Sequence, residues 1–227
     1  MIKVLIILPN NAEIKGFKNP AGFWFSEYVH FYTVVKMQNY DIDIASVLGG
    51  NIEPDKLSTQ RFFIDKEAEA YFYSREFMEN KLETFSLNEI KTKKYDAVYL
   101  AGGIGSFVYF NENNELTEII KATFANGGYV SACGFGVIAL LGLSTNGCDY
   151  LIDRKQITGF SKFEEQLIGI NKIVPFKLQD EIVKRNAFYS KAAIPLTSYA
   201  IKDGRIITGE NASSTRAVAW QLVYSLK

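Results

Sequence analysis

Histidine and cysteine are scarce in this chain of 227 residues, which has one histidine, His30, and two cysteines, Cys133 and Cys148. A zinc site normally takes several histidine or cysteine ligands, so we expect no metal. Two cysteines do not make a disulfide framework either. With so few cysteines and no recognisable export signal, we expect a cytoplasmic protein.

An excess of one charge is also missing, because 25 basic residues balance 25 acidic ones. Nucleic acids and anionic membranes are normally bound by basic surfaces, so we expect neither as a partner. The first apolar run, residues 3–8, is far too short to cross a bilayer. Hydrophobic residues make up 48% of the chain, enough to bury the core of one large domain spanning residues 1–227.

Apolar runs and helical patterns alternate along the sequence. Strands are predicted at residues 3–8, 42–47, 97–100, 129–132, 198–202 and 205–208. Helices are predicted at residues 23–37, 65–78, 116–124 and 217–226. This alternation predicts an α/β three-layer sandwich with a mostly parallel sheet. Asp203-Gly204 predicts a hairpin, expected as an appendage, and residues 48–66 and 149–195 are expected to be excursions.

Cys133 stands where a predicted strand meets a predicted helix, in the sequence Ser131-Ala132-Cys133-Gly134-Phe135-Gly136. A nucleophile elbow has this layout, and the N–H groups of the following helix would favour a thiolate. Elbow residues are strained, so we predict a positive φ at Cys133. Alternatively, Cys133 is a small buried hydrophobic residue, as most free cysteines are. Cys148, in a loop-like stretch, is given no role.

Two more features are expected at the carboxyl edge of the sheet, where open α/β sheets bind ligands. Gly102, Gly103 and Ile104 follow a predicted strand, and backbone N–H groups there would stabilise an oxyanion, unless the glycines only form a tight turn. Glu27 lies among aromatic residues, where burial would raise its pKa and let it donate a hydrogen bond to a thiolate. Alternatively, Glu27 faces solvent, as most glutamates do.

These motifs, in this order, resemble the ThiJ/PfpI superfamily, which has the class I glutamine-amidotransferase-like fold, a flavodoxin-like architecture. The resemblance covers nearly the whole chain and is strongest to the larger branch related to chaperone and glyoxalase proteins, often labelled type 1 glutamine amidotransferase-like. It is carried by Ala21–Glu27, Ala101–Gly103, Ser131–Gly134, Thr158–Ser161, Glu164-Glu165, Val174–Phe176, Asp203–Arg205 and Thr208–Asn211.

The resemblance implies roles for particular residues. Cys133 would be the nucleophile and Glu27 its carboxylate partner, within hydrogen-bonding distance of the sulfur. Gly102, Gly103, Ile104 and Gly134 would form the oxyanion and substrate pocket. The resemblance further implies an enzyme that needs no cofactor and acts on a small-molecule substrate, and we also expect a homodimer.

The chain departs from the family at two histidine positions. Many relatives have a histidine directly after the cysteine, where this chain has Gly134, and another in the facing loop, where it has Ile104. His30, one helical turn after Glu27, could support the site, although a structural role is expected for it. Without an imidazole, amide hydrolysis is disfavoured, which argues against a protease or a true glutamine amidotransferase.

Chemistry on a small electrophilic carbon remains open, because a thiolate adds to aldehydes, ketoaldehydes or isocyanides with one carboxyl group moving the proton. The sequence therefore favours a cysteine-dependent glyoxalase-like or isocyanide-hydratase-like enzyme. Two alternatives remain. One is a redox-responsive or chaperone-like stress protein with an oxidisable cysteine. The other is an inactive binding protein that keeps the pocket.

Overall fold

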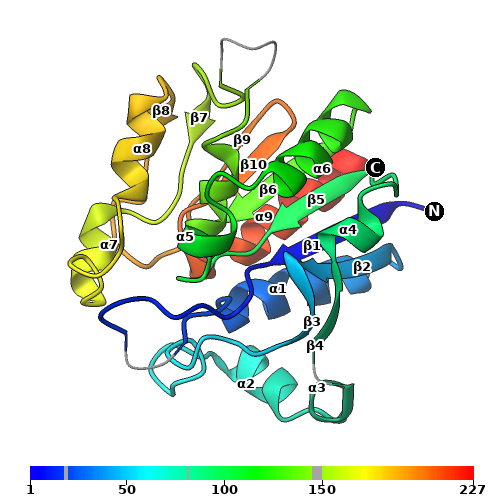
Figure 1. Ribbon diagram of the computed structural model, residues 1–227, viewed down its shortest axis with the longest axis horizontal. Coiled ribbons are helices and arrows are strands. Elements are labelled where there is room, and N and C mark those ends of the chain that lie inside the picture. The colour runs from blue at the N-terminus through cyan, green and yellow to red at the C-terminus, as the bar shows by residue number, and fades with distance from the viewer. Residues whose placement is uncertain (18–19, 81, 145–149) are drawn as a thin grey trace.

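A computed structural model describes residues 1–17, 20–80, 82–144 and 150–227. Within them, an eight-stranded sheet crosses the molecule and helices cover both of its faces (Figure 1). In sheet order the strands are β3 (Leu48–Ile52), β4 (Leu82–Ser86), β2 (Asp41–Ser46), β1 (Lys3–Leu8), β5 (Ala97–Leu100), β6 (Tyr129–Cys133), β10 (Ile206–Gly209) and β9 (Ala200–Asp203). Neighbouring inner strands are parallel, and the edge strands β3 and β9 are antiparallel to their neighbours. The predicted α/β sandwich with a mostly parallel sheet is confirmed.

The helices lie between the strands along the chain. They are α1 (Phe25–Lys36), α2 (Lys66–Phe72), α3 (Arg75–Asn80), α4 (Leu87–Ile90), α5 (Ser106–Tyr109), α6 (Asn114–Ala125), α7 (Lys162–Leu167), α8 (Leu178–Lys184), α9 (Thr215–Leu226) and the 3₁₀ turns η1 (Gly134–Leu140) and η2 (Ala212–Ser214). Among the described residues, none of these helices has the length and apolarity needed to cross a membrane.

The core forms on both faces of the sheet because the central strands β1 and β5 are apolar on both sides. In β1, Leu5 and Ile7 face one layer, which includes residues of α4, α6 and η1. Val4, Ile6 and Leu8 face the opposite layer, which includes residues of α1 and α9. The alternation of side chains along a strand thus divides a single apolar run between the two layers.

Residues 65–78 form two helices rather than the single predicted one. Helix α2 ends before Tyr73, and α3 begins after Ser74. The Ser74 hydroxyl accepts a hydrogen bond from the Phe77 N–H (3.2 Å) and donates one to the Tyr71 carbonyl (2.7 Å). A serine hydroxyl that bonds to the backbone in this way competes with helical hydrogen bonds. It also caps the start of a following helix, so α2 ends near Ser74 and α3 begins after it.

The hairpin around Asp203-Gly204 forms as predicted, but it is no appendage. Its second strand, β10, pairs in parallel with β6, and its first strand, β9, is the sheet edge. The two excursions also contain regular structure. The first holds β3, and the described part of the second holds α7, α8 and a small parallel pair of strands, β7 (Gln156–Ile157) and β8 (Phe188–Tyr189). Strand β4 was not predicted.

Candidate active site

The sharp turn after β6 lies at Gly134, one residue later than predicted. Cys133 has extended dihedral angles, φ −133° and ψ 148°, and still pairs with Gly209 of β10. Gly134 has φ +53°. The prediction of a positive φ at Cys133 is therefore wrong, because strand pairing keeps Cys133 extended and leaves the reversal to the next residue. Glycine has no β-carbon and adopts this left-handed conformation without strain.

The Cys133 side chain is fully buried. Its thiol donates a hydrogen bond to the Asn211 carbonyl (3.0 Å) and accepts one from the Thr215 hydroxyl (3.3 Å). These are the hydrogen bonds of the sulfur among the described residues, so the predicted bond to Glu27 is not formed. Burial, as the largest effect, raises the pKa of the Cys133 thiol well above its usual value, and the thiol is neutral at physiological pH.

Glu27 lies in the first turn of α1 and is buried, with 4% of its surface exposed. Its Oε2 atom accepts a hydrogen bond from the Gly102 N–H (2.6 Å). Burial raises the pKa of Glu27 to about 8, although the Gly102 bond acts in the opposite direction. This burial agrees with the predicted direction of the pKa shift, and it excludes the solvent-facing alternative. At neutral pH most molecules carry Glu27 as a neutral acid.

The Glu27 carboxyl group lies directly beside Gly134. A β-carbon placed on Gly134 would lie only 2.5 Å from Glu27 Oε1, closer than real β-carbons approach another atom. Gly134, the residue with the positive φ that is typical of an elbow, thus carries no side chain. The Glu27 carboxyl group fills the space beside it. The turn presents an acid where an elbow normally presents a nucleophile.

The loop after β5 fixes this arrangement from the other side. The Trp24 N–H donates to the Gly102 carbonyl (2.8 Å), which ties the loop to the start of α1. Gly103 has φ +137°, and a β-carbon there would collide with the Gly22 carbonyl, so only glycine fits. The Gly103 N–H makes no hydrogen bond within the described residues and is available to a ligand oxygen.

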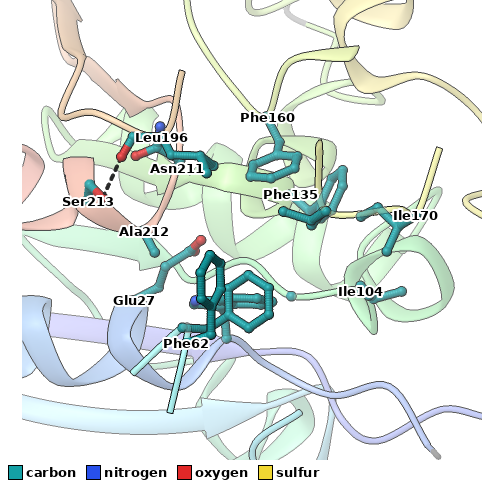
Figure 2. A pocket seen from close by; sticks show the side chains of 14 residues that line it. Glu27, Phe62, Ile104, Phe135, Phe160, Ile170, Leu196, Asn211, Ala212 and Ser213 are labelled. Carbon is teal, nitrogen blue, oxygen red and sulfur yellow. Dashed lines mark hydrogen bonds between the residues drawn. The ribbon is translucent and has the colours of Figure 1, made fainter. Parts of the chain in front are cut away.

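A cavity of about 270 Å³ opens above these groups. Figure 2 shows Glu27 pointing into it, with Phe135 and Phe160 across the cavity from it. The described lining residues are Trp24, Glu27, Phe62, Phe63, Gly103, Ile104, Phe135, Phe160, Ile168, Ile170, Leu196, Asn211, Ala212 and Ser213. Among them Glu27 is the one titratable side chain, and Cys133 is not included. One carboxyl group in apolar walls is not a metal-binding set.

The predicted site residues therefore separate into groups. Gly103 and Ile104 line the same cavity as Glu27. Gly102 holds the Glu27 carboxyl, and Gly134 makes room for it. Cys148 lies outside the described residues.

His30 lies beside the start of α2. Its Nε2 atom lies 2.6 Å from Asp65 Oδ2, and the other Asp65 oxygen caps α2 by accepting the Ala68 N–H (2.9 Å). His30 thus links α1 to the start of α2. Burial lowers the pKa of His30. The ring is not among the described residues that line the cavity.

Several lining residues were not predicted. Phe62 and Phe63 come from the first excursion, where an aromatic pair in a polar stretch is the signal that could have identified them. Leu196 and Asn211 are held by the buried Glu164 carboxylate, which accepts the Leu196 N–H (2.8 Å) and the Asn211 side-chain amide (2.7 Å). These contacts join segments that are distant in sequence, so local patterns do not reveal them.

Comparisons with known proteins agree with this fold. The model of the DJ-1/PfpI family matches residues 26–224, most of the chain. The chain belongs to the DJ-1/PfpI family. This confirms the predicted ThiJ/PfpI resemblance, including the glutamine-amidotransferase-like fold.

Two similar proteins are named for their activity. Glutathione-independent glyoxalase HSP31 of Saccharomyces cerevisiae is 28% identical, and the match covers 99% of this chain and 98% of that protein. Glyoxalase 3 of Candida albicans is 25% identical over 98% of both chains. Among solved structures, Rapid Encystment Protein 24 KDa of Francisella tularensis superimposes with a TM-score of 0.91, at 31% identity over 100% of both chains. The names of the glyoxalase relatives support the glyoxalase-like part of the predicted function.

Proposed function

We propose that this chain is a glyoxalase-type enzyme that needs no cofactor and acts on a small α-ketoaldehyde, with Glu27 moving the proton. The observation that carries the proposal is the buried Glu27 carboxyl group, whose pKa is raised to about 8, at an apolar cavity. A carboxyl group in such surroundings is a stronger base once ionised than an exposed one. The glyoxalase names of two full-length relatives support the same class.

The conversion of a ketoaldehyde to a hydroxy acid needs one proton to move between neighbouring carbons. In the hydrated aldehyde, the Glu27 carboxylate takes the hydrogen of the former aldehyde carbon as a proton, and the enolate of the hydrate forms. Glu27 then returns the proton to the former ketone carbon, and a hydroxyl proton of the first carbon passes to the former ketone oxygen. The second carbon becomes a secondary alcohol and the first a carboxylic acid. Water enters only as the hydrate, and no oxidant is consumed. The Gly103 N–H is available to the developing oxyanion.

The part of Cys133 in this reaction stays a prediction. For Cys133 to attack a substrate, the sulfur would have to leave Asn211 and Thr215 and the end of β6 would have to change conformation. The same burial and the raised thiol pKa disfavour the alternative of a redox-responsive cysteine, because oxidation follows exposure and thiolate character.

An inactive binding protein is the second candidate. The observation that favours it is Gly134, which leaves the elbow without a nucleophile. Such a protein would bind small carbonyl compounds in the cavity without converting them.

Turnover of methylglyoxal separates the two candidates. Lactate formation would be followed with the parent protein, with Glu27→Gln, and with Glu118→Gln as a matched control, because Glu118 is exposed on α6. We expect the parent and the control to form lactate and Glu27→Gln to lose at least about a hundredfold in rate. Binding of methylglyoxal without lactate formation would favour the second candidate, and unchanged turnover in Glu27→Gln would contradict the proposal.

We also propose that the protein is a cytoplasmic homodimer. The scarcity of cysteine supports the location, and the exposed edge strand β3 offers a surface for pairing. Light scattering should give twice the 25.6 kDa mass of the chain, and a mass of one chain would contradict the dimer.

A further inference from the structure

We propose that a small uncharged thiol from solution completes this site, so that the preferred substrate is the hemithioacetal of a ketoaldehyde; this inference rests on the proposed function. The described lining residues carry neither a thiol nor an amine, and the left-handed turn position is Gly134. The site therefore offers a base without a nucleophile. A substrate that already carries its sulfur would need none from the protein.

The polarity of the cavity favours the sulfur adduct over the hydrate. A hydrated aldehyde brings two hydroxyl groups on one carbon, beside the ketone oxygen. Two donors of the described lining residues lack a partner, the Gly103 N–H and the Trp24 indole N–H, enough for the ketone oxygen and one hydroxyl group but not for two. The Ser213 hydroxyl donates to the Leu196 carbonyl (2.8 Å), and the Asn211 amide donates to Glu164. In the hemithioacetal one hydroxyl is replaced by a sulfur atom, which needs no hydrogen bond. A buried hydroxyl without a partner weakens binding.

The aromatic wall suits a sulfur atom. Phe135 lies next to Phe107 and Phe160, with ring centroids 4.8 and 5.0 Å from its own. Phe135 also follows Gly134 directly, so the rings stand beside the turn. Polarisable sulfur packs favourably against aromatic rings. The arrangement places an apolar, sulfur-tolerant surface across the cavity from its one base.

The charge of the thiol is restricted as well. Neither lysine nor arginine occurs among the described lining residues, so an anionic thiol would be buried without a counter-ion. A cavity of about 270 Å³ accepts the adduct of a ketoaldehyde with a short thiol. The geometry thus favours short neutral thiols over longer, charged ones such as glutathione.

The reaction is an isomerisation followed by hydrolysis. The thiol sulfur bonds to the aldehyde carbon, and the thiol proton ends on the aldehyde oxygen. The Glu27 carboxylate removes the hydrogen of that carbon as a proton and returns it to the former ketone carbon, and the hydroxyl proton of the hemithioacetal passes to the former ketone oxygen. The first carbon is thereby oxidised to a thioester carbonyl while its neighbour is reduced to an alcohol. Water then cleaves the thioester, giving the hydroxy acid and releasing the thiol.

The test measures methylglyoxal consumption and thioester formation with increasing 2-mercaptoethanol, using a cysteine-free protein, Cys133→Ser with Cys148→Ser. An inert thiol would slow the reaction, because it withdraws the free aldehyde and its hydrate. We expect instead that the rate of methylglyoxal consumption rises about tenfold, because the adduct avoids burying one hydroxyl group without a hydrogen-bond partner. A thioester should also be detected by mass spectrometry. Mercaptoacetate, which is anionic, should give no rise.

Controls separate this inference from the proposed function. Adding Glu27→Gln to the cysteine-free protein should abolish the rise, whereas adding Glu118→Gln should not. A Glu27-dependent rate that falls as 2-mercaptoethanol increases would overturn the inference and leave the proposed function standing. If the cysteine-free protein is not folded by circular dichroism, the same titration is made with the parent chain. There a thiol-independent rate would overturn the inference equally.

Discussion

The Glu27 carboxyl group occupies the space that a side chain at position 134 would need. Glu27 Oε1 lies 2.5 Å from the place where the β-carbon of a residue at 134 would stand, and Oε2 is held by the Gly102 N–H. Gly134 and Glu27 are therefore a matched pair. The glycine permits the tight turn, and the absence of its side chain lets the acid reach the backbone of the turn.

Gly134→Ala should reduce stability more than the same change at another left-handed glycine. The backbone conformation costs about 1 kcal/mol for alanine, and displacing a buried carboxyl group adds about 1–3 kcal/mol. Gly204→Ala is the matched control, because Gly204 has φ +60° and nothing lies within 4 Å of its β-carbon position. The free energies of unfolding would be measured in urea.

Removing the acid should relieve the clash. We expect Gly134→Ala to cost less in a Glu27→Ala background than in the parent protein, so that the two changes are not additive. Equal costs of alanine at 134 and at 204 would show that Glu27 does not fill the space beside Gly134.

The stability of the folded protein should decrease as pH rises, because of Glu27. A glutamate has an ordinary pKa of 4.5, and burial raises that of Glu27 to about 8, so the folded state holds its proton more tightly than the unfolded state does. The stabilisation is complete below about pH 4.5 and is lost as pH rises through about 8. Each unit of difference corresponds to about 1.4 kcal/mol, which predicts a loss of several kcal/mol.

Glu27→Gln isolates this effect, because glutamine does not titrate. As pH rises from 5 to 9, the unfolding free energy of the parent should decrease relative to that of Glu27→Gln. Other titrating groups contribute to both proteins and cancel in that difference. A difference that stays constant over this range would mean that Glu27 keeps an ordinary pKa.

Cys133 should react slowly with iodoacetamide in the folded protein. Its sulfur is buried and hydrogen-bonded, and its raised pKa leaves little thiolate at pH 7. We expect labelling of Cys133 at least about a hundredfold slower than in guanidinium chloride. Peptide mass spectrometry keeps Cys133 apart from Cys148. Rapid labelling at neutral pH would show that the sulfur reaches solvent and would restore Cys133 as a nucleophile.

Much of the fold could be predicted because buried parallel strands are continuous apolar runs. Residues 3–8 and 97–100 form the strands that their composition predicts. Strand β4 was missed because its five residues, Leu82–Ser86, include only two apolar ones, Leu82 and Phe85, which are separated by two polar residues and show no strand period. The split between α2 and α3 depends on one serine hydroxyl, which helical periodicity does not reveal.

The site was predicted in part because burial of Glu27 follows from its aromatic neighbours. The turn was placed one residue early because both Cys133 and Gly134 suit a strand-to-helix junction in sequence. Pairing of β6 with β10 decides between them, and that pairing joins residues 76 positions apart, such as Cys133 and Gly209. The cavity walls from Phe62, Phe160 and Leu196 depend on similarly distant contacts.

The most direct test of the account is the ionisation of Glu27 measured beside the rate of methylglyoxal conversion. The ionisation of the Glu27 carboxyl group would be followed through the ¹³C NMR chemical shift of its carboxyl carbon. The Glu27→Gln variant would be used to assign the signal. We predict a midpoint near pH 8, and a rate that rises about tenfold from pH 7 to its plateau with the same midpoint, because the ionised carboxylate is the base. A midpoint near 4.5, or a rate that does not follow the ionisation of Glu27, would contradict the account.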